Sequence, residues 1–160
     1  MKNIVLVRID DRLIHGQVVT AWIKQTGGNK IVIVDDPLTK DVFMQRILKA
    51  AAPPDIKVEV FTTAGAAEFL KGDAESCEKV VVLAKTPFPL KKLMDEGIMF
   101  EKIILGGMGA KTERKKFNKN VSASPEEVLC MRNITQSGTK IYYQLVPMES
   151  PVDMERVLNV

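Results

Sequence analysis

Short apolar runs rich in valine and isoleucine recur along the chain and are separated by segments with helical spacing. The runs that predict strands are residues 4–7, 30–34, 57–61, 79–83, 102–105 and 140–145. Several of them are continuously apolar and do not alternate with polar residues, which is typical of parallel strands buried on both faces.

The segments between these runs place apolar residues on one helical face. The predicted helices are residues 16–26, 39–51, 63–71, 88–96, 125–136 and a short C-terminal one at 151–158. Thr39 is expected to cap the second helix, and Ser124 followed by Pro125 is a strong helix start. The alternation predicts an α/β fold: one domain over residues 1–160 with an open, mostly parallel β-sheet and helices on both faces.

Composition narrows the class of protein. Of the 160 residues, 46% are hydrophobic and 27% charged, so we expect a well-filled core and a soluble surface. The net charge of +3 is too small to indicate nucleic-acid binding by itself. Cys77 and Cys130 form no CxxC pair and are expected to stay reduced, and the chain has too few Cys and His residues for a zinc cluster. We therefore expect no metal and no cofactor.

Membrane insertion is not expected either. The apolar run at the N-terminus meets charged residues at once, and no stretch approaches the roughly 20 apolar residues that span a bilayer. The sequence predicts a cytoplasmic protein whose membrane association, if any, comes through a partner.

The stretch RIDDRLIHGQVV (8–19) contains the only histidine of the chain, His15, directly after the first predicted strand. Ligands of open parallel sheets bind beyond the carboxyl ends of the strands. At a helix entry, backbone N–H groups favour an anion, and Arg12 offers a planar donor fork for phosphate oxygens. Asp10 or Asp11 is placed to fix one imidazole nitrogen and leave the other nucleophilic. These are the parts of a phosphohistidine carrier, but the residues alone leave a helix-capping histidine with solvated charges equally open.

Other strand exits offer weaker signals. GGMGAKT (106–112) is not a nucleotide-binding P-loop, because Ala110 stands between the last glycine and the lysine, although a glycine-rich turn can still approach a phosphate.

The segment KTERKKFNKN (111–120) is basic. It has three alternative interpretations: a solvated loop, a docking surface for an acidic or phosphorylated partner, and a nucleic-acid contact. The segment has a single phenylalanine, so it offers no row of aromatic side chains on which bases could stack, and nucleic-acid binding is disfavoured.

The residues also resemble a known family. RIDDRLIHGQVVTAW is similar to the signature of the IIB component of the mannose/fructose/sorbose family of the bacterial phosphoenolpyruvate-dependent sugar phosphotransferase system. IVIVDDPLTKDVFMQRILKAAAPP, VVVLAKTP and IILGGMGA resemble its later segments, so that the likeness covers nearly the whole chain.

The resemblance implies a phosphotransferase that takes a phosphoryl group from a phosphohistidine of IIA, carries it on Nδ1 of His15, and passes it to a sugar brought in by the membrane components IIC and IID. It implies that Arg12 binds the phosphate and that Asp10 orients the imidazole. Further residues expected at the substrate or phosphate site are Arg8, Asp11, Gly16, Asp36, Lys85, Thr86, Gly106 and Gly107. IIA is expected to be a separate polypeptide, and the sequence does not name the sugar or the oligomeric state.

Two other functions compete with this one. A regulatory module that senses a phosphorylated small molecule would use the same arginine and glycine-rich loop, with His15 as a ligand contact. A nucleic-acid binder would use residues 111–119 and would be retained on DNA or RNA with a steep dependence on salt.

Overall fold

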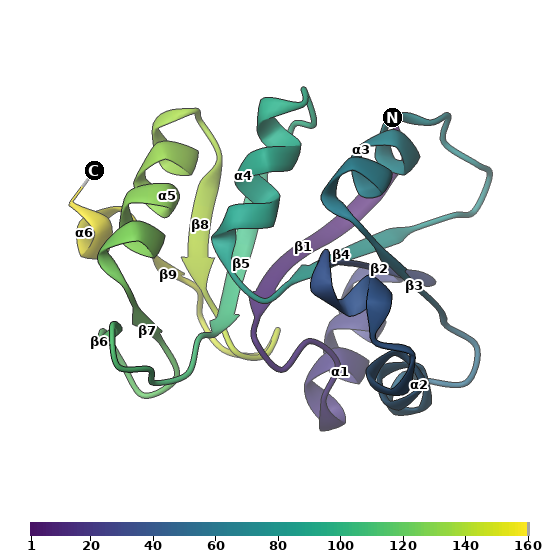
Figure 1. The fold of residues 1–160 in the computed structure, drawn as a ribbon, viewed down its shortest axis with the longest axis horizontal. Coiled ribbons are helices and arrows are strands. Elements are labelled where there is room, and N and C mark those ends of the chain that lie inside the picture. Colours follow the sequence, from purple (N-terminus) through teal and green to yellow (C-terminus); the bar gives the residue numbers. More distant parts are fainter. Residues whose placement is uncertain (160) are drawn as a thin grey trace.

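A computed structural model describes residues 1–159 (Figure 1). Residue 160, the last of the domain predicted to span 1–160, lies outside the described residues. The strands are β1 (Ile4–Asp10), β2 (Lys30–Val34), β3 (Lys57–Phe61), β4 (Val80–Ala84), β5 (Lys102–Gly107), β6 (Lys115–Lys116), β7 (Ser122–Ala123), β8 (Lys140–Tyr143) and β9 (Val152–Asp153). The helices are α1 (Gly16–Thr26), α2 (Val42–Ala51), α3 (Thr63–Lys71), α4 (Pro87–Asp95), α5 (Pro125–Gln136) and α6 (Glu155–Leu158), with a 3₁₀ turn η1 (Pro37–Lys40) before α2.

The main sheet has the strand order β3-β2-β4-β1-β5-β8-β9. Every pairing in it is parallel except that of β9, which runs antiparallel to β8 at the edge. In Figure 1, α3, α4 and α5 lie above the sheet, and α1 and α2 lie below it. The predicted fold class, an open and mostly parallel sheet with helices on both faces, is therefore confirmed.

The central strands are apolar throughout because they separate two cores. On β2, Val32 and Val34 belong to the core under α3, α4 and α5, whereas Ile31 and Ile33 belong to the core over α1 and α2. The same alternation holds along β4 and β5. Successive side chains of a strand point to opposite faces, so a strand covered by helices on both sides has no polar position left.

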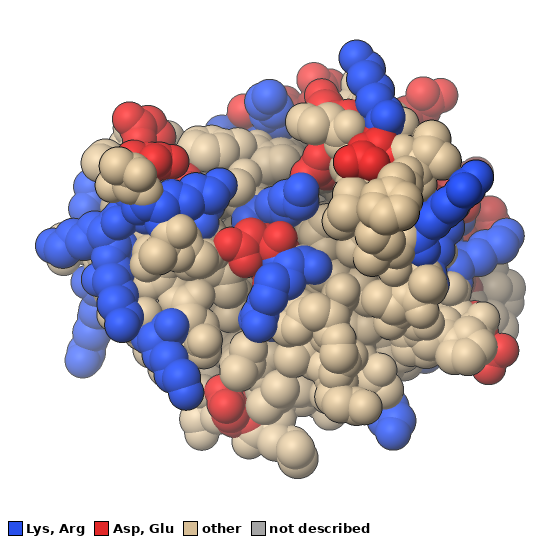
Figure 2. All heavy atoms as spheres, turned by 60° about the horizontal axis from the view of Figure 1, so that its bottom comes forward, with Lys and Arg blue, Asp and Glu red and all other residues tan. Residues whose placement is uncertain are grey.

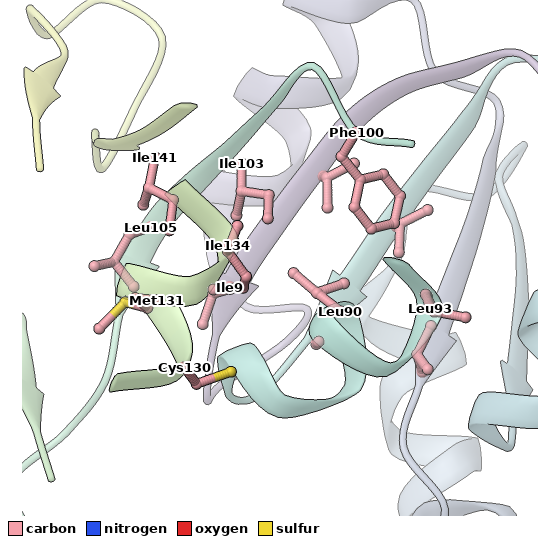
Figure 3. Close-up of a cluster of buried hydrophobic side chains, with 14 of the residues drawn as sticks. Ile9, Leu90, Leu93, Phe100, Ile103, Leu105, Cys130, Met131, Ile134 and Ile141 are labelled. Atoms are coloured by element: carbon pink, nitrogen blue, oxygen red, sulfur yellow. The ribbon is translucent and has the colours of Figure 1, made fainter. Parts of the chain in front are cut away.

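The core on the α4 and α5 side fixes the sheet centre (Figure 3). Leu90 and Leu93 of α4, and Met131 and Ile134 of α5, are buried against strand residues that include Ile9 of β1. Full burial of a Leu or Ile side chain stabilises a fold by about 1.5–3 kcal/mol. This packing makes the carboxyl end of β1 a rigid platform for the loop that follows it.

Helix α5 begins as the sequence predicted. The Ser124 side chain accepts a hydrogen bond from the backbone N–H of Glu127, the Glu127 carboxylate accepts one from the Ser124 N–H, and Pro125 occupies the first turn. This reciprocal capping satisfies two N–H groups that an uncapped helix would leave without partners.

Two helix predictions are wrong at their ends. The helix predicted over 39–51 starts at Val42, because the Asp41 side chain caps it through the Met44 N–H, and Thr39 lies in the preceding 3₁₀ turn. The helix predicted over 151–158 is limited to Glu155–Leu158. Val152–Asp153 pair instead with Tyr142–Tyr143, which covers the free edge of β8.

Strand β1 is longer than the apolar run that predicted it. It continues through Arg8 to Asp10, so these two residues lie two positions apart on the same face of the sheet. Residues 106–123 contain the end of β5 and the two-stranded antiparallel ribbon β6–β7.

Candidate phosphoryl-transfer site

The candidate site lies where β1 and β5 end side by side. After β1 the chain crosses toward β2, whereas after β5 it continues toward β8 on the other side. Two adjacent parallel strands whose connections leave in opposite directions form the crevice where open α/β sheets bind ligands. The residues predicted from RIDDRLIH therefore stand at the switch point of the topology.

Asp10 is the centre of this site, and its side chain is fully buried. Its Oδ1 accepts hydrogen bonds from the backbone N–H of Arg12 at 3.0 Å and from Arg12 Nε at 3.3 Å. Its Oδ2 lies 3.1 Å from Arg8 Nη2 and 3.1 Å from His15 Nε2. One carboxylate thus joins two arginines and the histidine.

These contacts keep Asp10 ionised in spite of its burial. Burial by itself would raise the pKa of Asp10, but the Arg12 backbone N–H, the contact with His15 and the nearby Arg8 charge outweigh it and lower the pKa below its usual value. An ionised carboxylate can only accept, so the His15 nitrogen facing it, Nε2, carries the proton. The other ring nitrogen, Nδ1, keeps its lone pair.

His15 is the N-cap residue of α1 and has an extended backbone conformation, and its side chain makes no capping hydrogen bond. The imidazole is 23% exposed. Leu13 and Ile14 just before it are buried in the core between α1 and the sheet, with Leu13 at the unusual positive φ of 58°. The two apolar anchors fix the loop, and Gly16, at a φ of 47°, turns the chain into the helix.

Arg12 is the accessible cation of the site. Its side chain is 51% exposed, and its Nε and backbone N–H hold it against Asp10. Its Nη2 also donates to Asp10 Oδ2 at 3.5 Å. This leaves Nη1 of the planar fork available to an anion, as are the backbone N–H groups of the first turn of α1. A phosphoryl group on His15 would therefore meet positive charge on the solvent side.

Arg8 lies behind Asp10, away from solvent. Its guanidinium stacks over the Trp22 ring of α1 at 5.6 Å and donates from Nη1 to the backbone carbonyl of Gln144 at 3.2 Å. Burial lowers the pKa of Arg8, and the Asp10 charge opposes that lowering. The arrangement suits Arg8 to hold Asp10 in place, not to touch a ligand.

The two predicted glycines of β5 have different surroundings. A Cβ on Gly106 would lie 2.1 Å from Arg8 Nη2, so only glycine leaves room for the buried guanidinium. A Cβ on Gly107 would make only ordinary contacts, at 3.4 Å, with Arg12 and Asp10. Gly107 contributes its carbonyl, which accepts from the Asp11 N–H at 3.1 Å.

Asp11 points away from the histidine and into the loop after β5. Its carboxylate accepts the Gly109 N–H at 2.7 Å and lies 3.6 Å from Arg114 Nη1. Arg114, with only 2% of its side chain exposed, also donates to the Gly109 carbonyl and forms a double hydrogen bond with Glu127 at the start of α5. Asp11 thus braces this loop, while Asp10 contacts the imidazole.

The remaining predicted residues follow the strands on the other side of β1 from β5. Lys85 and Thr86 follow β4, the neighbour of β1, and Lys85 lies 3.7 Å from Asp35. Asp36 follows β2, one strand beyond β4, and its carboxylate accepts from the backbone N–H and the hydroxyl of Thr63. Asp36 therefore binds Thr63 at the start of α3 and does not contact His15.

Within residues 1–159 no cluster of three His, Cys, Asp or Glu side chains is arranged to hold a metal ion. No helix in the described part of the chain is both long and apolar enough to cross a membrane. A pocket of about 340 Å³ is lined by residues 1–7, 99–102 and 104, along the early parts of β1 and β5. It lies toward the opposite end of these strands from His15.

Three supporting residues were missing from the sequence prediction: Trp22, Arg114 and Glu127. Trp22 lies on the apolar face of the predicted helix 16–26, which indicates a core residue. Its contact with Arg8 is visible only in the folded chain. Arg114 lies in the basic segment 111–120, for which the sequence left a solvated loop, a docking surface and a nucleic-acid contact open. An isolated arginine among lysines was a usable signal, because arginine favours buried ion pairs and lysine does not.

Comparisons with known proteins show what the chain as a whole is similar to. The profile of the PTS system sorbose subfamily IIB component matches residues 4–160. The sorbose-specific EIIB component of Lacticaseibacillus casei is 35% identical over 94% of this chain and 92% of its own. The fructose-specific EIIB component of Bacillus subtilis is 27% identical over 99% and 98%. The crystal structure of the IIBSor domain of the sorbose permease from Klebsiella pneumoniae superposes with a TM-score of 0.92 at 30% identity, covering 98% of this chain and 96% of that one.

Proposed function

Since this chain belongs to the sorbose subfamily of phosphotransferase-system IIB components, we propose that His15 is its phosphoryl carrier and that Asp10 and Arg12 are the residues that make it one. The observation that supports this most is the 3.1 Å contact between His15 Nε2 and Asp10 Oδ2. Beside an ionised carboxylate, this contact favours the proton on Nε2, which supports Nδ1 as the nucleophile.

In the proposed first step, the Nδ1 lone pair attacks the phosphorus of a phosphohistidine on IIA. The new Nδ1–P bond forms as the donor's N–P bond breaks, and the donor imidazole leaves with that electron pair. The His15 ring, still protonated on Nε2, gains positive charge, which the buried Asp10 carboxylate stabilises. Arg12 and the N–H groups of the first turn of α1 contact the equatorial oxygens.

In the proposed second step, a hydroxyl oxygen of the sugar attacks the same phosphorus and the imidazole leaves as the neutral Nε2–H form. The sugar hydroxyl loses its proton to solvent. Transfer between nitrogen and oxygen atoms that are aligned in this way needs positioning and charge stabilisation more than covalent machinery, and it requires no metal or nucleotide.

The surrounding system follows from the same proposal. Residues 1–160 act as one IIB domain in the cytoplasm, IIA is the donor, and the membrane components IIC and IID present the sugar and hold the protein at the membrane surface. The activity is that of a protein-Nπ-phosphohistidine–sugar phosphotransferase. The relatives named above are specific for sorbose and for fructose, so these two ketoses are the first sugars to test.

Labelled phosphoryl groups supplied on phosphorylated IIA test the proposal directly. Wild-type protein should take up label as an acid-labile, base-stable phosphoramidate whose phosphorus NMR signal is that of Nδ1-phosphohistidine. His15→Gln should take up none while keeping the wild-type circular dichroism. Label on His15→Gln, or an Nε2 adduct on the wild type, would contradict the assignment.

A further inference from the structure

Strand β6 of the β6–β7 ribbon, together with its flanks (residues 111–119), carries a concentrated positive charge. Lys111, Lys115, Lys116 and Lys119 are exposed, and Glu113 is the one acidic residue among them. Arg114 is neutralised by Glu127. The exposed excess of this segment is therefore three positive charges, as large as the net charge of the whole chain.

These lysines are held outward by a well-anchored backbone. Phe117 is partly buried against the core, Val121 is buried, and the Asn118 side chain accepts the N–H groups of Asn120 and Val121. Asp11 and Arg114 fasten the start of the segment to the loop that carries His15. The ribbon thus lies at the same edge of the sheet as the site, and Lys and Arg gather toward the left of that edge in Figure 2.

We propose that the lysines of residues 111–119 bind the anionic phospholipid headgroups of the membrane surface directly. Protein interfaces are depleted in lysine and enriched in aromatic residues and arginine, whereas here the aromatic residue and the arginine of the segment face inward. Lys115 and Lys116 are consecutive in a strand and point to opposite sides of it, which suits a diffuse layer of charge better than one shaped partner. Phosphate headgroups form such a layer.

This contact turns the edge of the sheet that holds His15 toward the membrane, where the membrane components present the sugar. The membrane link expected only through a partner is then supplemented by the chain's own surface. Because lipid binding needs no phosphoryl group, its failure would leave the proposed function untouched.

Co-sedimentation with vesicles of phosphatidylcholine, with and without phosphatidylglycerol, is the test. Wild-type protein should pellet with the phosphatidylglycerol vesicles only and should be released by high salt. Each lysine near an anionic surface contributes a factor of about 5, so Lys115→Glu with Lys116→Glu should lower the partition coefficient by at least about 25-fold.

Lys57→Glu with Lys102→Glu is the matched control. Both lysines are exposed and begin strands at the opposite edge of the sheet, and the change in net charge is the same. The control should retain vesicle binding within about 5-fold of wild type. Equal loss in both variants, or no binding of wild-type protein to phosphatidylglycerol vesicles, would overturn the proposal. So would a ribbon variant that binds vesicles normally but accepts phosphoryl groups from IIA more slowly, since the lysines would then serve a protein partner.

Discussion

His15 Nε2 and Asp10 Oδ2 lie 3.1 Å apart, and Arg8 Nη2 contacts the same carboxylate oxygen from the buried side at 3.1 Å. Asp10 is therefore fixed between a permanent cation and the imidazole. Its charge decides which nitrogen of His15 is protonated and, in the proposed mechanism, which nitrogen accepts the phosphoryl group.

Asp10→Asn should reduce phosphoryl acceptance by about 10²–10⁴-fold. The donors from Arg8 and Arg12 compete for the single amide oxygen, which turns the amide NH₂ toward His15. The imidazole must then accept at Nε2 and carry its proton on Nδ1, the wrong tautomer for attack. Single-turnover transfer from phosphorylated IIA measures the effect. Asp11→Asn, whose side chain faces Gly109, is the control, and an equal loss in both variants would contradict this role of Asp10.

Arg12→Ala should lower the transfer rate by about 10²–10³-fold, because it removes a charged donor from the developing phosphoryl group. The half-exposed side chain contributes little to stability, so the urea midpoint should stay within experimental error of wild type. Arg12→Lys should recover only part of the rate, since an ammonium lacks the planar fork. If Arg12→Ala transfers at the wild-type rate, Arg12 does not bind the phosphoryl group.

The lowered pKa of Asp10 predicts a pH dependence of stability. A carboxyl whose pKa is lower in the folded than in the unfolded chain stabilises the fold fully above the unfolded pKa, near 3.8, and loses that contribution as the pH falls through the folded pKa. The difference in unfolding free energy between wild type and Asp10→Asn should therefore be constant near neutrality and shrink below about pH 4. Urea denaturation at a series of pH values measures it. Asp73→Asn, at an exposed position, should show no such trend.

The sequence predicted the fold class and the loop of the candidate site because both follow from local pattern. Valine-rich runs predict buried parallel strands, and RIDDRLIH follows the first of them, so Asp10, Arg12 and His15 were expected together and the structure brings them together. The end of β1 was missed because Arg8 and Asp10 are charged, and only the ion pair between them permits their burial in a strand.

Long-range contacts explain the remaining differences. Asp36 follows a strand end as His15 does, but the strand order separates β2 from β1 by β4, which no local pattern encodes. The C-terminal segment has helical spacing, yet Val152 and Asp153 pair with β8 because that edge is otherwise open. Arg114 is buried because α5 brings Glu127 to it across 13 residues.

Gly106→Ala should destabilise the protein by about 1–3 kcal/mol, because its methyl group would overlap the guanidinium of Arg8. Gly107→Ala, next to it, meets only ordinary contacts and should cost less than about 1 kcal/mol. The comparison should be repeated in an Arg8→Ala background, where the space is free and the cost of Gly106→Ala should fall below that same level. Equal costs in both backgrounds, measured by urea denaturation, would show that the clash with Arg8 is not the cause.

Arg114→Met should lower the free energy of unfolding by about 3–5 kcal/mol, since it leaves the Glu127 carboxylate buried without its charged partner. Hydrogen bonding to Arg114 and Ser124 outweighs burial and lowers the pKa of Glu127, so the unpaired carboxylate would lose much of this stabilisation. Arg114→Met with Glu127→Met should recover part of the loss, because two apolar side chains pack without a buried charge. Lys115→Met, at the adjacent exposed position, should change stability by no more than about 0.5 kcal/mol. Urea denaturation of the three variants against wild type would refute the role of this ion pair if Arg114→Met and Lys115→Met were equally stable.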